Sequence, residues 1–129
     1  LEDNGFALLR YEDNVVASFH TSWTQWKNLF SLEIFGTKGA LIVEGLGGSY
    51  GAETITTWLR PPEGGAPNQQ TKTFNEPDNS WDMEWIDFLG AVQDGSSYLG
   101  TPTEGLATMR TLEAIYLSAE ANVPVAVVR

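Results

Sequence analysis

The sequence is poor in metal-binding and basic side chains. None of its 129 residues is cysteine and only one is histidine, so a disulfide framework and a thiolate metal site are excluded and few other metal sites can be built. Seventeen acidic residues against seven basic ones give a formal net charge of −10, which repels phosphate backbones and anionic lipids. We therefore expect no metal site, and neither nucleic acid nor a membrane as a partner.

Long apolar runs are missing as well. No stretch approaches the roughly 18 apolar residues of a membrane-spanning helix, and no basic-then-apolar leader opens the chain. The lack of cysteine suits the cytoplasm, where we expect the protein. The sequence opens on Leu1 rather than methionine, which we interpret as a piece of a longer protein. Its 42% apolar and 12% aromatic residues are enough for one core, so we expect a single domain over residues 1–129.

The hydrophobic pattern of the first 45 residues has a period of two, which predicts antiparallel strands. Three hairpins can be paired so that apolar residues share one face. The predicted tips are Glu12-Asp13, 24–27 and 36–39, and the pairs are Phe6 with Phe19, Leu8 with Ala17, Ala17 with Ile34, Phe19 with Leu32, Ile34 with Leu41 and Leu32 with Val43. The other face mixes polar and apolar side chains, among them Tyr11, His20 and Phe35. Because a shift of one residue would scramble both faces, the pattern predicts a four-stranded meander.

The rest of the chain adds strands and then helices. Residues 55–59 and 71–74 are β-branched and aromatic and lie on either side of a proline-rich and glycine-rich loop. Apolar residues from Trp81 to Val92 have helical spacing, with Asn79 or Ser80 as the cap, and their stripe should be buried. Thr101, Pro102 and Glu104 predict the start of a second helix that runs to about Asn122, and 123–128 should form a closing strand. The predicted fold is α+β: an open, mainly antiparallel sheet, made of the N-terminal meander plus further strands, with two C-terminal helices packed on one face.

A glycine-rich stretch, VEGLGGSYGAET at 43–54, follows an apolar strand in the manner of a dinucleotide-binding loop. That motif requires a third glycine where the strand turns into a helix. Tyr50 occupies this place here, and the residues that follow are typical of a strand. The stretch is therefore interpreted as a connection between strands, with Gly47 and Gly48 needed for positive φ or close packing, and no cofactor is expected to bind it.

Other polar groups carry two interpretations each. His20, predicted to lie beside Ser31 and near Glu33, fits either a proton relay or a histidine hydrogen-bonded across a sheet or in an interface. Asp82, Glu84 and Asp87 lie off the apolar stripe of their helix and are interpreted as a solvated face. A denser group is formed by Trp23, Gln25, Trp26 and Lys27 at a hairpin end. Aromatic rings with amide and ammonium donors suit a sugar, and they equally suit a packed tip or a subunit contact.

Five segments in order resemble a known family. They are EDNGFA at 2–7 with Ser22-Trp23, LEIFGTKGAL at 32–41, WIDF at 85–88, TEGLA at 103–107 and EAIYLSA at 113–119. Together they are similar to the C-terminal domain of the glucose–fructose oxidoreductase, inositol dehydrogenase and rhizopine-catabolism (Gfo/Idh/MocA) family. The resemblance spans essentially the whole chain.

The resemblance implies a parent enzyme that oxidises a sugar or polyol with NAD or NADP. Family members carry an N-terminal Rossmann domain, a Glu-Lys-Pro motif with a catalytic lysine, and a helical Asp and His, none of which occurs in this sequence. The resemblance therefore implies no catalytic residue and no cofactor-binding residue in this chain. It implies that the sheet forms one wall of the substrate cleft, with Trp26, Lys27 and Asn28 touching substrate, and that its open face joins copies into a homo-oligomer.

Two other functions remain open at this stage. A free-standing carbohydrate-binding module would use Trp23, Trp26 and Trp58 as stacking platforms. A structural association domain would dimerise and bind no ligand.

Overall fold

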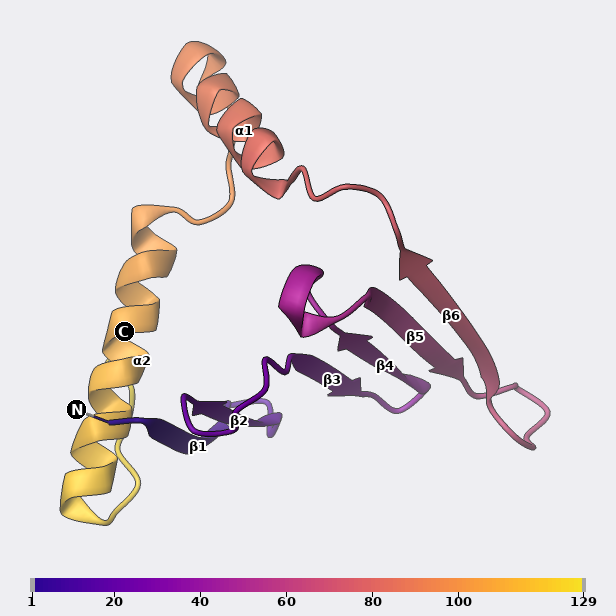
Figure 1. The fold of residues 1–129 in the computed structure, drawn as a ribbon. Helices are drawn as coiled ribbons and strands as arrows, with labels where there is room; N and C mark the ends of the chain where they lie inside the picture. Colours follow the sequence, from indigo (N-terminus) through magenta and orange to yellow (C-terminus); the bar gives the residue numbers. More distant parts are fainter. Residues whose placement is uncertain (1, 129) are drawn as a thin grey trace. The chain divides into compact units, whose positions relative to one another are not determined.

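The computed structural model describes residues 2–128, which contain six strands, a short 3₁₀ helix and two α-helices (Figure 1). In chain order they are β1 (Asn4–Arg10), β2 (Val16–Ser22), β3 (Ser31–Phe35), β4 (Gly39–Glu44), η1 (Gly48–Tyr50), β5 (Glu53–Leu59), β6 (Asn68–Phe74), α1 (Ser80–Asp94) and α2 (Pro102–Ala121). The strands form two antiparallel sheets, β1-β2 and β3-β4-β5-β6. This arrangement confirms the α+β class.

The chain divides into two compact units. The first, here called the sheet unit, holds Thr21–Asp78 together with the N-terminal residues up to Gly5, and so contains β3 to β6. The second, the helix unit, holds Phe6–His20 and the residues from Asn79 onward, and so contains both α-helices. The hairpin of β1 and β2 contributes to both units.

The hairpin of β3 and β4 has the predicted register. Leu32 pairs with Val43 and Ile34 with Leu41, and the Gly36 N–H donates to the Gly39 carbonyl across the turn at 2.9 Å. Gly39 is required there because a Cβ at this position would overlap the carbonyl oxygen of Trp58 on β5. The close approach of β4 to β5 therefore depends on a missing side chain.

The two faces of the four-stranded sheet differ in character. The pairing places Leu32, Ile34, Leu41, Val43 and Ile55 on one face. The opposite face carries a threonine pair at its centre, where Thr56 and Thr71 face each other with hydroxyl oxygens 3.0 Å apart. Thr56 is buried, so this hydrogen bond satisfies the hydroxyl that the sheet removes from water.

The hairpin of β1 and β2 differs from its predicted register by one residue. The Tyr11 N–H donates to the Val15 carbonyl at 2.9 Å, and Asn14 between them has a left-handed φ of 64°. The loop therefore has three residues, not the two expected at Glu12-Asp13. Asparagine tolerates left-handed backbone, and such three-residue loops are common in hairpins.

The extra loop residue moves the aromatic side chains. Phe6 stacks on His20 with ring centroids 4.1 Å apart, where the prediction had Phe6 opposite Phe19. At the open end of the hairpin the Trp23 N–H donates to the Asp3 carbonyl at 2.8 Å, in the same shifted register. Phe6 consequently shares a face with His20 and not with Phe19.

Two further predictions about strands are wrong. Among the described residues β2 and β3 belong to separate sheets, so the four paired strands are β3 to β6 and not the first four. The pairing of Ala17 with Ile34, and of His20 with Ser31, is not formed. Residues 123–128, all of which the structure describes, form no strand. At the start of this segment the Ser118 hydroxyl of α2 donates a hydrogen bond to the Val123 carbonyl at 2.7 Å.

Both helices begin and end close to where the sequence indicates. α1 has Asn79 as its N-cap and ends at Gly95, which is left-handed at φ 72° and donates to the Ala91 carbonyl. α2 opens with a capping box, in which Thr101 accepts from the Glu104 N–H while the Thr101 N–H and hydroxyl donate to the Glu104 carboxylate. The two hydrogen bonds that the Glu104 carboxylate accepts, from the N–H and from the hydroxyl of Thr101, hold its pKa below the ordinary value.

Within the helix unit the apolar stripe of α1 is little covered, and its predicted packing on the sheet face stays a prediction. Trp81 is 80% exposed and Trp85 59% exposed, although Trp85 lies near Phe88 and Phe88 meets Tyr98 edge-on at 6.2 Å. Asp87, predicted to be solvated, accepts a hydrogen bond from the Leu99 N–H at 3.3 Å. This bond ties the loop after α1 back to the helix. Within residues 2–128 neither helix combines the length and apolar character needed to cross a membrane.

Candidate functional site

The candidate site is a pocket in the sheet unit, between two loops. One is the tryptophan loop, residues 23–30, which connects β2 to β3, and the other is the glycine loop, residues 45–51, which connects β4 to β5. The pocket has a volume of about 380 Å³ and is lined by Ser22, Trp23, Gln25, Trp26, Lys27, Asn28 and Ser49. It is referred to below as the loop pocket.

Hydrogen bonds hold the tryptophan loop at both ends. At its start the Asn4 side-chain amide donates to the Thr24 hydroxyl at 2.8 Å, and the Thr24 N–H donates to Ser22 Oγ at 3.0 Å. At its end the Gly45 N–H donates to the Phe30 carbonyl at 3.2 Å, which continues the β3-β4 ladder one step beyond the strands. The loop therefore has fixed ends, and its tip carries exposed side chains.

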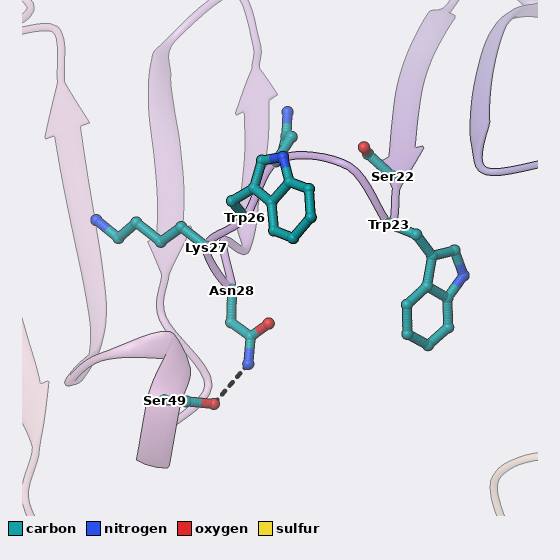
Figure 2. Close-up of a pocket in the computed structure, with 7 residues that line it drawn as sticks. Ser22, Trp23, Trp26, Lys27, Asn28 and Ser49 are labelled. Carbon is teal, nitrogen blue, oxygen red and sulfur yellow. Dashed lines mark hydrogen bonds between the residues drawn. The ribbon is translucent and has the colours of Figure 1, made fainter.

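A side-chain hydrogen bond joins the two loops. Asn28 Nδ2 donates to Ser49 Oγ at 2.6 Å, and the two side chains point toward each other in Figure 2. Ser49 lies on η1, whose turn is closed by hydrogen bonds from Tyr50 N–H to the Gly47 carbonyl and from Gly51 N–H to the Gly48 carbonyl. This contact brings together two stretches that the sequence singled out for separate reasons.

Trp26 adopts a backbone conformation that is unusual for its type. Its φ is 57°, and the other described non-glycine residues with positive φ are asparagines, Asn14 and Asn122. A bulky residue in this region is a genuine outlier, at a cost of about 1–3 kcal/mol. The ring is 96% exposed, so packing against the chain does not compensate for this cost. In Figure 2 it lies between the side chains of Lys27 and Trp23, which extend in opposite directions.

The structure brings together the residues that the family resemblance assigned to substrate. Trp26, Lys27 and Asn28 all line the loop pocket, as does Trp23. Trp58, which a carbohydrate-binding module would also use, lies on β5 and is not among the described residues that line this pocket. The binding role of the three assigned residues stays a prediction.

Sequence reasoning missed Ser49. The sequence did contain a signal for it. The predicted pairing of Leu32 with Val43, extended by two residues, places Phe30 opposite Gly45. A further extension in the same direction brings Asn28 close to the glycine loop, which carries Ser49. His20, by contrast, lies on β2, which belongs to a different sheet from β3, the strand that carries Ser31 and Glu33. It stacks on Phe6, while the Ser31 hydroxyl donates to Glu33 Oε1 at 3.4 Å on its own strand.

The glycine loop does not have the geometry of a dinucleotide site. It joins strand to strand through a single 3₁₀ turn, whereas a pyrophosphate is held at the N-terminus of a helix that follows the first strand. Gly47 and Gly48 have left-handed φ values of 73° and 51°, which confirms the conformational role predicted for them. Within residues 2–128 no three His, Asp or Glu side chains are grouped so that they could hold a metal ion.

Comparison with known proteins identifies the domain. Residues 1–127 match the family model described as oxidoreductase family, C-terminal alpha/beta domain (GFO_IDH_MocA_C). No curated protein and no solved structure matches the chain. Because the family match covers nearly the whole sequence, the chain belongs to the C-terminal domain family of the Gfo/Idh/MocA oxidoreductases.

Proposed function

We propose that this domain forms one wall of the substrate cleft in an NAD(P)-dependent oxidoreductase that acts on a sugar or cyclitol. The observation that carries the proposal is the loop pocket, because a domain of this oxidoreductase family gathers two indole rings, two amides and two hydroxyls around one opening. Aromatic faces pack against the apolar face of a sugar ring, while amide and hydroxyl groups hydrogen-bond its hydroxyls.

In this proposal the dinucleotide and the catalytic groups belong to another part of the complete enzyme. The strand-to-strand geometry of the glycine loop supports this division, since it leaves no helix N-terminus for a pyrophosphate. Residues of this chain bind and orient the substrate. Trp26 packs on the sugar ring, and Asn28 and Ser49 hold its hydroxyls in place.

Turnover by the complete polypeptide tests the division of labour. The complete protein should oxidise a sugar or polyol with NAD or NADP, and the isolated domain should oxidise none. Calorimetric titration of the isolated domain with NAD should detect no binding. Micromolar NAD affinity, or turnover by the domain alone, would contradict the proposal.

A pair of tryptophan variants tests the pocket in the complete enzyme. Trp26→Gly removes the ring and should raise KM roughly fivefold, because an aromatic contact contributes about 1 kcal/mol. Trp81→Ala removes another highly exposed ring, one that does not line the pocket, and should leave KM unchanged. Equal effects of the two variants would assign the pocket no part in substrate binding.

The same domain is proposed to join copies of the enzyme through the open face of its four-stranded sheet, which is the face that carries Thr56 and Phe35. Phe35 at the end of β3 is 71% exposed, and large exposed apolar side chains on a sheet mark association surfaces. Light scattering should detect a dimer or larger assembly, and Phe35→Lys should weaken it. Leu99→Lys, at a comparably exposed apolar position in a loop, is the control. A strictly monomeric protein would contradict this part of the proposal.

A free-standing carbohydrate-binding module makes a different prediction. Such a module binds glycans unaided, so titration of the isolated domain with neutral sugars would change its tryptophan fluorescence at micromolar to low millimolar ligand. One wall of a cleft should give no such change. The position of Trp58 outside the loop pocket favours the cleft wall.

A further inference from the structure

The residues that line the loop pocket include a positively charged side chain and no negatively charged one. Its seven lining residues are Ser22, Trp23, Gln25, Trp26, Lys27, Asn28 and Ser49, and none of them is acidic although the chain has seventeen acidic and only seven basic residues. Lysine and the tryptophan indole can only donate hydrogen bonds, and amides and hydroxyls can donate as well. Sugar hydroxyls can be satisfied by donors and acceptors alike, so the positively charged lysine is the lining residue that distinguishes a ligand with a negative charge.

The hydrogen bond between the two loops adds to the hydrogen-bond donors that the pocket can offer a ligand. Asn28 donates its side-chain N–H to Ser49 Oγ, so the serine oxygen acts as the acceptor in this contact. The hydroxyl hydrogen of Ser49 is thereby directed away from Asn28 and is available as a donor to another group. Lys27 lines the pocket from the neighbouring position on the same loop. In Figure 2 its side chain extends away from Asn28 and Ser49, so its flexible stem must turn inward to place the ammonium beside a ligand held there.

We propose that the loop pocket selects a sugar or polyol that carries a carboxylate, with the Lys27 ammonium pairing with the carboxylate and Trp26 packing on the carbon skeleton. The inference rests on the proposed function and deepens it by naming the charge of the substrate. Charge-assisted hydrogen bonds between ammonium and carboxylate are roughly twice as strong as neutral ones. The exposed setting of the tryptophan loop limits the gain, because water and salt screen the pair.

A carboxylate fits this site better than a phosphate. One ammonium group balances one negative charge, and the pocket has no arginine and no second lysine. A phosphate monoester carries about −1.5 to −2 charges at pH 7. The net charge of −10 on the chain opposes such a dianion about twice as strongly as a monoanion.

Steady-state kinetics of the complete polypeptide test the inference with three substrates: a hexuronic acid, the neutral hexose and the hexose 6-phosphate. The hexuronic acid should have the highest kcat/KM. Lys27→Met keeps the aliphatic stem and removes the charge, and it should lower the preference for acid over neutral sugar on the order of fivefold through KM. Lys27→Arg should retain the preference. Lys38→Met, the same change at a lysine that does not line the pocket, should retain it too.

The outcomes separate the two proposals. If no sugar or polyol is oxidised, the proposed function itself fails. If the neutral hexose is oxidised as efficiently as the acid and Lys27→Met has no selective effect, the charge inference fails while the cleft wall stands. A preference for the phosphate would overturn the assignment of a carboxylate.

A binding measurement on the isolated domain decides the charge inference without turnover. Uronate added to tens of millimolar, far above the range in which a free-standing module binds, should shift the NMR signals of the Trp26 indole N–H and the Asn28 side-chain amide. Neutral hexose should shift them less, and raising the salt concentration should reduce the difference. The Lys27→Met domain should respond equally to both ligands. Equal shifts in the unmodified domain would overturn the inference.

Discussion

The two hairpins, β1-β2 and β3-β4, reverse the chain by different means. The first uses a loop of three residues in which Asn14 takes the left-handed conformation. The second closes a hydrogen bond from Gly36 to Gly39, and the close packing of its second strand against β5 depends on Gly39. In the first hairpin the loop sets the register by its length, whereas in the second the neighbouring strand also constrains it. Register is therefore more firmly specified where a third strand shares the hairpin.

Of the variants considered for the two hairpins, Gly39→Ala is expected to lower the free energy of unfolding the most. The added Cβ would overlap the Trp58 carbonyl, so β4 and β5 must separate, at a cost of about 3 kcal/mol in the free energy of unfolding. Gly36→Ala is the matched control, because its Cβ would meet the Gly39 carbonyl at an ordinary 3.6 Å. Urea denaturation should show a large loss for the first variant and a change within about 0.5 kcal/mol for the second. Similar losses in both would show that close strand packing is not the cause.

Asn14→Val should affect the β1-β2 hairpin somewhat less. A β-branched side chain at a φ of 64° is disfavoured by about 2 kcal/mol, and no neighbouring strand compensates. Asn14→Gly relieves the same constraint and should leave stability close to that of the original chain. NMR contacts between the Phe6 and His20 rings report on the register and should persist in the glycine variant. Loss of these contacts in both variants would show that the asparagine side chain itself defines the loop.

Trp26→Gly tests the loop that joins the two hairpins. The change removes a bulky residue from left-handed backbone and should raise the free energy of unfolding by about 1 kcal/mol, while it lowers substrate binding in the complete enzyme. Opposite signs for stability and binding would identify strain retained for function. A loss of stability in urea denaturation would instead mean that the exposed ring packs against the chain.

Ser49→Ala should have the smallest effect. It removes the acceptor of the 2.6 Å hydrogen bond from Asn28, and a net loss of about 0.5 kcal/mol is expected for an exposed bond of this kind. The NMR signals of the Asn28 side-chain amide should broaden or shift, while the paired residues of β3 and β4 keep theirs. Unchanged amide signals would show that the two loops are held together by their backbones.

The sequence predicts those parts of the fold that depend on local chemistry. The capping box of α2, the glycine end of α1, the Gly36–Gly39 turn and the pairing of Leu32 with Val43 all follow from residue type and spacing, and all are observed. Asn79 takes the N-cap position of α1 without a side-chain hydrogen bond. The β1-β2 register fails because Glu12-Asp13 and Glu12-Asp13-Asn14 are both acceptable loops, and the periodicity of the strands alone does not decide between them. A hairpin tip at 24–27 was expected between β2 and β3, whereas the observed connection is the whole of 23–30 and the strands lie in different sheets. Period-two alternation shows that a segment is a strand but not which strand it pairs with.

The candidate site was predictable in part. Trp26, Lys27 and Asn28 follow from the family resemblance together with an unusual cluster of aromatic and donor side chains. Ser49 required the β3-β4 ladder to be extended past its strand ends, a step that the predicted register allowed. The left-handed conformation of Trp26 had no signal, because tryptophan gives no reason to expect it.

The glycine loop has a consequence for how the pocket can evolve. Ser49 is carried on a backbone whose shape at Gly47 and Gly48 few other residues can adopt, so mutations there damage the scaffold before they alter ligand preference. The exposed side chains of the tryptophan loop can be exchanged at little structural expense. Divergence among descendants of this domain should therefore accumulate at 23–27, where new substrate preferences can arise, and spare 45–51.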